Sequence, residues 1–158
     1  SEVTPVAVLG DPERIMKVGI ASPYIISHTA ICDPELTYSC PARLTAISGA
    51  DALTHAIEAL TAVRRPATPM LVHEHVFVGK NLLSDHHALR AIELISRSLA
   101  RACSKSSDEA AREDLMLGAL LAGLAFGTAG TAAAHAIQEP VGALTHTPHG
   151  TGVALLMP

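Results

Sequence analysis

Four side chains of types that commonly bind transition metals occur as two pairs in this sequence. Asp51 and His55 are four residues apart in one apolar stretch, and His135 and His149 are fourteen residues apart in another. In a helix, a spacing of four places two side chains on the same face, one turn apart. One carboxylate and three imidazoles suit a divalent ion such as iron or zinc, which can act as a Lewis acid on an alcohol or carbonyl oxygen. The residues therefore predict a metal site, provided that the two pairs meet.

Each of these residues also has a simpler interpretation. An Asp–His pair four residues apart is usually a hydrogen-bonded or surface pair, and a lone histidine after three alanines, like His135, is more often a core residue. The combination favours a metal, because buried imidazoles and a buried carboxylate need partners and a shared cation supplies one. His149 lies between Pro148 and Gly150, at an expected helix start that can direct its imidazole inward.

The other histidines are weaker candidates for a site. We expect His146, three residues before His149, to lie near the same pocket, and His28 to be structural. The sequence predicts four histidines on the surface: His73, His75, His86 and His87. No GxGxxG, P-loop or GxSxG motif is present, and no cysteine has a neighbouring histidine, so neither a phosphate-binding loop nor a serine or cysteine nucleophile is indicated.

The composition indicates a helical protein of a reducing compartment. Hydrophobic residues make up 49% of the chain but aromatic residues only 3%, so the core must consist of aliphatic side chains, which favours close-packed helices. The net charge of −4, without a cluster of basic residues, argues against a nucleic-acid partner. Three cysteines without metal spacing fit the cytoplasm. No signal peptide is visible, and the apolar residues 115–129 are too few for a membrane span, so we expect no membrane partner.

The secondary structure is expected to change from strands to helices near residue 40. Three short apolar runs between turn signals predict strands at residues 5–9, 16–20 and 24–31. Residues 64–83 contain two prolines and are predicted as a long loop with a short strand at 76–78. The chain begins without Met and stops in an apolar run, so we expect it to be a piece of a longer protein.

Helices are predicted over the rest of the chain from periodicity and capping residues. The first expected helix spans residues 42–61, with Ser48-Gly49 as a candidate break. The second runs from Ser84 as its N-cap to about Ser104, and the third runs from Ser106 as its N-cap toward Gly127. A short helix is expected at 132–137, ending near Pro140, and a last helix is expected to start at His149. Residues 145–148 are expected to form a loop.

Several segments resemble the iron-containing (group III) alcohol dehydrogenases. Residues 49–59, GADALTHAIEA, resemble the first signature of that family. The second signature is matched, with its fourteen-residue spacing, by His135-Ala136, Gly142 and Pro148-His149-Gly150. Residues 1–4 resemble the end of the family's Thr-Gly-Ser-Glu-Val-Thr segment, and residues 33–37 resemble its strand leading to the helical domain.

The resemblance implies a two-domain, dehydroquinate synthase-like architecture. In that family an α/β dinucleotide-binding domain precedes an all-helical metal domain. Residues 1–38 would then be the end of the first domain, which is incomplete, and residues 39–158 the helical metal-binding domain, truncated at its C-terminus. The chain itself is expected to be mainly α with a short N-terminal β segment.

The resemblance also implies a metal-dependent alcohol dehydrogenase that transfers a hydride between an alcohol or aldehyde and NAD or NADP. The metal, Fe²⁺ or Zn²⁺, would bind the alcohol oxygen and lower its pKa before the hydride passes to the nicotinamide. The implied site residues are Asp51, His55, His135 and His149 as metal ligands, with Ser1 and Thr4 at the cofactor. The full-length protein is expected to be a cytoplasmic homodimer or larger homo-oligomer, and the fragment alone to be inactive.

Two alternatives stay open. One is a relative on the same fold with different chemistry, of the glycerol dehydrogenase, maleylacetate reductase or dehydroquinate synthase type. The other is a catalytically inactive helical domain that binds a metal or only a partner.

Glu139 departs from the family pattern and is the candidate catalytic residue. Many members carry a histidine four residues after the third ligand, near the nicotinamide, whereas this chain has Glu139, one helical turn after His135. The carboxylate can transfer a proton, serve as an additional metal ligand, or simply be tolerated. A helix end near Pro140 would instead turn it toward solvent.

Overall fold

The computed structural model describes residues 2–11, 13 and 16–157. Strands β1 (Val6–Asp11) and β2 (Met16–Ala21) form an antiparallel hairpin in which Val6 pairs with Ala21 and Asp11 with Met16. The helices are α1 (Ala42–Thr61), α2 (Leu71–Glu74), α3 (Leu82–Ser104), α4 (Glu109–Ala129), α5 (Ala133–Thr145) and α6 (His149–Leu156), with 3-10 turns at Pro23–Ile25 and Pro34–Thr37. The predicted fold class, mainly α with a short N-terminal β segment, is confirmed.

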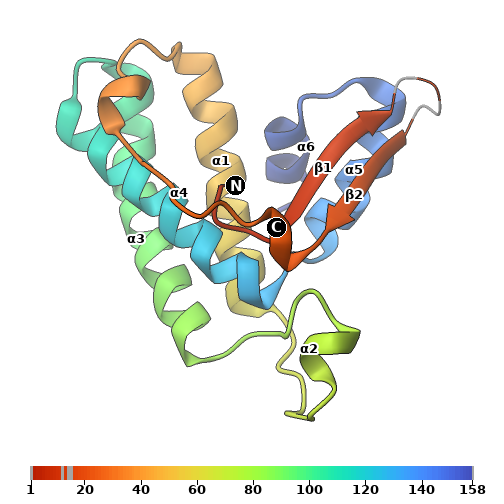
Figure 1. Ribbon diagram of the computed structural model, residues 1–158. Helices are drawn as coiled ribbons and strands as arrows, with labels where there is room; N and C mark the ends of the chain where they lie inside the picture. The colour runs from red at the N-terminus through yellow and green to blue at the C-terminus, as the bar shows by residue number, and fades with distance from the viewer. Residues whose placement is uncertain (1, 12, 14–15, 158) are drawn as a thin grey trace.

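Helices α1, α3 and α4 pack against one another to form the main bundle (Figure 1). Small side chains fill the contact, and Ala56, Ala91 and Ala122 are buried in its centre. Gly49 lies directly against the side chain of Leu99 on α3, where a Cβ would collide with it. The predicted break at Ser48-Gly49 is therefore wrong: the glycine allows close helix packing, and α1 continues through it without interruption.

Arg112 ties the start of α1 to the other two helices of the bundle. Only 3% of this residue is exposed. Its guanidinium donates hydrogen bonds to Thr45 Oγ1 at 2.7 Å and to the carbonyl oxygen of Cys40 at 3.0 Å. A third bond, to the carbonyl oxygen of Ala102 near the end of α3, is 3.4 Å long. These bonds fix where α1 begins, and with it the helix that carries the first ligand pair.

Two helices begin at different caps from those predicted. Helix α3 is capped by Asn81, whose side chain accepts from the N–H of Ser84, while the Ser84 hydroxyl accepts from the N–H of Asn81. Ser84 is thus the third residue of a capping box and not the cap itself. Helix α4 is capped by Asp108, which accepts from Ala111 N–H and also pairs with Arg101 of α3 at 2.9 Å. A cap at Ser106 lacks the charge for that second contact.

Two predicted strands are absent from the described residues. The segment 24–31 begins as a 3-10 turn after Pro23, in which the Ser22 hydroxyl accepts from the N–H of Tyr24. Pro23 cannot donate to a sheet, and Tyr24 is 95% exposed, so neither a ladder nor a core holds the segment extended. Residues 76–78 form no strand either, because only an isolated bridge between Arg64 and Gly79 pairs the two ends of this loop.

Helix α5 extends beyond its predicted end. Pro140 has no N–H for the carbonyl of Ala136, yet the helix continues to Thr145. It ends at His146, which adopts a left-handed conformation with φ of 57°. The predicted helix start at His149 is confirmed by α6.

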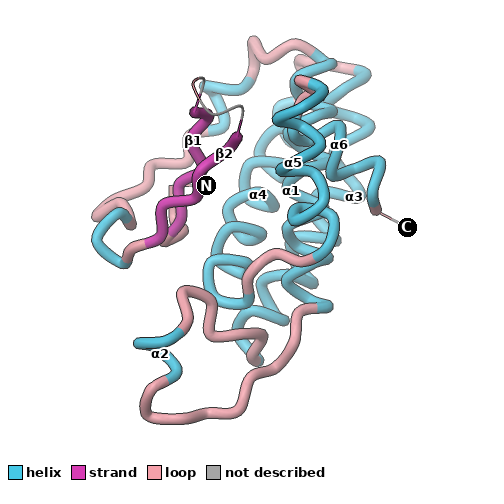
Figure 2. The backbone as a smooth tube through the Cα atoms, turned by 90° about the vertical axis from the view of Figure 1, so that its right-hand side faces the viewer, coloured by secondary structure: helices cyan, strands magenta, loops and turns pink. Residues whose placement is uncertain are grey.

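The hairpin lies outside the bundle, with β2 against α5 (Figures 1 and 2). Helices α5 and α6 pack on each other, and α6 packs on α1. Within the described part of the chain, no single helix is both long enough and apolar enough to cross a membrane. Helices α4 and α5 meet these two criteria only when they are taken together, and they are bent by 100° relative to each other.

Candidate metal centre

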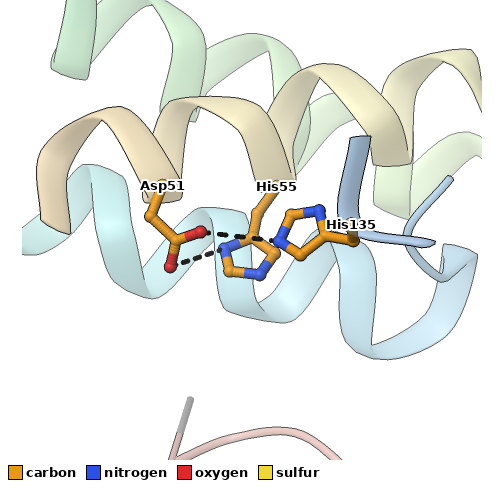
Figure 3. A group of neighbouring side chains, drawn as sticks. All are labelled: Asp51, His55 and His135. Atoms are coloured by element: carbon orange, nitrogen blue, oxygen red, sulfur yellow. Dashed lines mark ion pairs between the residues drawn. The ribbon is translucent and has the colours of Figure 1, made fainter. Parts of the chain in front are cut away.

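Asp51, His55 and His135 meet between α1 and the start of α5 (Figure 3). One potential ligand atom from each lies within 4.8 Å of the others. Asp51 Oδ2 is 3.8 Å from His55 Nδ1, and Asp51 Oδ1 is 3.5 Å from His135 Nε2. The two pairs recognised in the sequence therefore share one location, although about eighty residues separate them in the chain.

His149 completes the set from the first residue of α6. Its Nε2 is 3.6 Å from Asp51 Oδ1, and its ring centroid is 5.2 Å from that of His135. It is more exposed than the other three and stands outside their compact group. Gly150 lets α6 come this close, because a Cβ there would collide with the backbone carbonyl of Ile47 on α1.

The polar atoms at the centre of this group fit a divalent cation. Asp51 Oδ1 and His135 Nε2 are buried, and neither has a hydrogen-bond partner among the described residues. Buried polar atoms are normally paired, since leaving one unpaired costs about 1–3 kcal/mol. A cation between the two atoms would satisfy both. One carboxylate with imidazoles is a donor set that suits iron and zinc.

The ring of His55 is held in a stack. It lies between Phe126, at a centroid distance of 4.2 Å and an interplanar angle of 12°, and His135, at 4.3 Å and 26°. Burial lowers the pKa of His55 to about 4, against the opposing effect of Asp51. Its imidazole is therefore neutral at pH 7, which is the form that binds metals. Phe126 was not predicted as a site residue, because it carries no signal beyond its place in an apolar helix.

Glu58 is a second residue that the sequence analysis missed. Its Oε2 is 2.6 Å from His135 Nδ1, and the carboxylate is buried. Burial raises the pKa of Glu58, but hydrogen bonds from the backbone and from His135 outweigh burial and lower it. A signal was available, because Glu58 follows Asp51 by seven residues and so shares its helix face.

Glu139 lines the same cavity, and its side chain is 32% exposed. Its carboxylate is 3.1 Å from Lys17 Nζ and 3.7 Å from His149 Nδ1. Lys17 Nζ is itself 3.4 Å from His149 Nδ1. The helix continues through Pro140, which keeps Glu139 on the face of His135. Lys17, which comes from the hairpin, was not anticipated as a neighbour of the site.

A cavity of about 760 Å³ lies in front of these residues. It is lined by the four predicted ligands, by Glu139 and Lys17, and by parts of β1. Thr4, predicted at the cofactor, is buried and also lines the cavity. Ser1, its predicted companion, lies outside the described residues.

The remaining histidines lie away from the cavity. The prediction for His146 is wrong: it is exposed where α5 ends, since its backbone turns the chain out of the helix there. The structural role predicted for His28 is wrong too, because this residue is exposed, with Nδ1 3.0 Å from Thr29 Oγ1. The predicted surface position holds for His73, His75 and His86, whereas His87 is half-buried, with a buried Nδ1.

The chain is similar to known proteins over its whole length. The model of the Fe-containing alcohol dehydrogenase family, C-terminal, matches residues 45–158. A long-chain-alcohol dehydrogenase 1 of Geobacillus thermodenitrificans is 42% identical over 158 residues, which are 100% of this chain and 36% of that protein. The chain thus spans about a third of the length of this curated relative.

Solved structures share the fold. An alcohol dehydrogenase from Oenococcus oeni superimposes with a TM-score of 0.85 at 30% identity, covering 98% of this chain and 37% of that one. A sulfoacetaldehyde reductase from Bifidobacterium kashiwanohense, solved in complex with NAD⁺, has a TM-score of 0.82 at 32% identity, covering 96% of this chain and 36% of that one.

Proposed function

The chain belongs to the Fe-containing alcohol dehydrogenase family, and we propose that it is the metal-binding part of an NAD- or NADP-linked alcohol dehydrogenase. In this proposal residues 1–38 are the C-terminal end of a dinucleotide-binding domain, and residues 39–158 are the first part of a helical metal-binding domain. The observation that carries it is the convergence of Asp51, His55 and His135 around two buried polar atoms that have no hydrogen-bond partner among the described residues.

Four residues would hold the metal, Fe²⁺ or Zn²⁺: Asp51, His55, His135 and His149. Among the four proposed ligands, Asp51 is the one that carries a negative charge and so offsets part of the charge of the metal. The three imidazoles complete a mixed nitrogen and oxygen donor set. When bound, the metal supplies a Lewis acid that lowers the pKa of an alcohol oxygen. The half-exposed position of His149 keeps the side of the cavity open to a small substrate.

The cofactor would enter from the hairpin side of the cavity. Thr4 lines that side together with Val6, Ala7 and Val8 of β1, and Ser1 is proposed as its companion. A nicotinamide cofactor as such is supported by the relative that was solved with NAD⁺. The proposed substrates are small alcohols and aldehydes as a class, with NAD or NADP as the cofactor.

Glu139 is proposed as the proton acceptor of the reaction. Its carboxylate lines the cavity and lies 3.1 Å from Lys17 Nζ, and a carboxylate in this position can accept the proton of a bound alcohol. Its 3.7 Å separation from His149 Nδ1 connects it to the ligand set. We further propose that the full-length protein acts in the cytoplasm as a homodimer or larger homo-oligomer.

Metal content and activity of the full-length protein test this function together. We expect the protein, reconstituted without oxygen, to retain about one Fe²⁺ or Zn²⁺ per chain and to reduce NAD or NADP with a primary alcohol. Replacing His135 by Ala should abolish both metal retention and turnover. A protein that folds, keeps no metal and still oxidises alcohols would contradict the proposal. Metal retention without turnover on any alcohol or aldehyde would favour the inactive metal-binding domain.

A further inference from the structure

Glu58 is a carboxylate buried inside the helical bundle. Only 4% of the residue is exposed. Asp51, His55 and Glu58 are spaced i, i+4 and i+7, so they share one face of α1. A buried carboxylate is rare unless its oxygens are paired. The partners of Glu58 therefore reveal why this face of the helix carries a second acid.

Two of the partners are backbone N–H groups at the start of α5. Ala132 N donates to Glu58 Oε2 at 2.9 Å, and Ala134 N donates to Oε1 at 2.7 Å. Ala132 is the N-cap residue of α5, and it makes no side-chain capping bond. The carboxylate of another helix takes that place, where the helix dipole also favours negative charge. Glu58 thereby fixes the start of α5 relative to α1.

The third partner is His135, in the first turn of α5. Its Nδ1 is 2.6 Å from Glu58 Oε2. Both oxygens of Glu58 accept backbone bonds, which favours the ionised carboxylate. An ionised carboxylate can only accept, so Nδ1 is the donor. A neutral His135 then carries its proton on Nδ1 and has a free lone pair on Nε2. That atom is the one that lies 3.5 Å from Asp51 Oδ1.

We propose that Glu58 is the positioning residue that holds His135 as its Nδ1–H tautomer, with Nε2 directed at the metal. The inference rests on the proposed metal site and assigns Glu58 no contact with the metal itself. Carboxylates that accept the second ring N–H of a histidine ligand fix its orientation and raise its basicity. Here the same carboxylate also sets the helix that carries the ligand.

The test compares Zn²⁺ affinity of the full-length protein with that of a Glu58→Gln variant. The amide keeps the shape of the carboxylate but has one acceptor and one NH₂ group. An NH₂ facing Nδ1 favours a proton on Nε2, where it opposes the metal. We expect Zn²⁺ affinity to fall by about 10- to 100-fold. The matched control is Ser98→Ala, which removes a buried hydrogen bond to Leu94 on α3 and should leave Zn²⁺ affinity unchanged.

A spectroscopic readout distinguishes positioning from a purely structural role. In the ¹H–¹⁵N NMR spectrum of the Zn²⁺-loaded protein, we expect His135 to bind Zn²⁺ through Nε2 and its Nδ1–H proton to be shifted downfield. The Ser98→Ala variant should keep this downfield proton signal. Glu58→Gln should lose the downfield shift. Coordination through Nδ1 in the unsubstituted protein overturns the inference without any variant, as does a Glu58→Gln protein with unchanged affinity and spectrum. An unsubstituted protein that folds but binds no Zn²⁺ overturns the proposed function as well.

Discussion

His55 and His135 lie side by side, yet their pKa values shift in opposite directions. Burial lowers the pKa of His55 to about 4. Burial also acts to lower the pKa of His135, but the carboxylates of Asp51 and Glu58 outweigh it and raise the pKa above the usual 6.5. Neighbouring acids, and not depth alone, therefore decide which imidazole keeps its proton in the metal-free protein.

This difference predicts the pH dependence of metal binding. A protonated imidazole cannot bind a metal, so protons and the metal compete for the ligand nitrogens. Because the pKa of His135 is raised, His135 is the first of the ligands to become protonated as the pH falls. Zn²⁺ affinity of the full-length protein should already decline above pH 6.5, whereas protonation of His55 should matter only near pH 4. Competitive titration with a chelator between pH 8 and 6, with correction for the chelator's own protonation, measures the decline. Affinity that is constant over this range would contradict the assignment of His135.

Glu139 supports a second prediction at this scale. If its carboxylate accepts the proton of the alcohol, Glu139→Gln in the full-length enzyme should lower kcat by about 10²- to 10⁴-fold and remove one limb of the pH–rate profile. Metal content, measured in parallel, should not change. Unchanged turnover with an unchanged profile would exclude proton transfer. Glu139→His asks whether the histidine common in the family sustains activity at this position.

At the scale of elements, the site depends on how closely α6 approaches α1. Gly150 packs against the backbone carbonyl of Ile47, and the residue before it in sequence is His149. A backbone group cannot rotate away as a side chain can, so a Cβ at this position must move the whole helix. The approach of α6 is what brings the fourth imidazole to within 3.6 Å of Asp51.

Gly150→Ala should therefore weaken the metal site from outside it. We expect overpacking to destabilise the protein by about 1–3 kcal/mol, and Zn²⁺ affinity to fall because His149 is displaced. Thermal unfolding and Zn²⁺ titration of the full-length protein measure the two effects. The matched control is Gly19→Ala, since no atom lies within 4 Å of a Cβ placed there. Equal Zn²⁺ affinity in both variants would show that α6 placement does not matter.

At the scale of the whole molecule, the hairpin is held differently from the helices. Strands β1 and β2 pair only with each other among the described residues, and Val8, Leu9, Met16, Val18 and Ile20 are all exposed. The bundle instead buries alanines on three helices around Ile95 and Leu94. A two-stranded hairpin that leaves most of its apolar side chains exposed is only marginally stable in water.

Hydrogen exchange of the 158-residue chain should report this contrast. We expect amides of β1 and β2 to exchange orders of magnitude faster than those of α1 and α4, because most apolar side chains of the hairpin are already exposed and opening it exposes little more. Mass spectrometry of peptic fragments covers both regions in one experiment. Protection in Val6–Asp11 equal to that in Glu109–Ala129 would mean that the hairpin is stabilised by contacts that the structure does not show.

The sequence by itself determined the parts of this protein that depend on local pattern. The bounds of α1, the start of α6, the helical fold class and the donor types of the candidate site all follow from periodicity, caps and residue chemistry, because their causes lie within a few neighbouring residues. The family signatures added the pairing of residues 51 and 55 with residues 135 and 149.

Only the tertiary structure decided how these parts meet. Glu58 caps a helix that begins more than seventy residues later, and Lys17 of the hairpin forms an ion pair with Glu139. Gly150 allows α6 to pack closely against α1. Each depends on which segments pack together in space, and the packing of distant segments leaves no periodic trace in the chain.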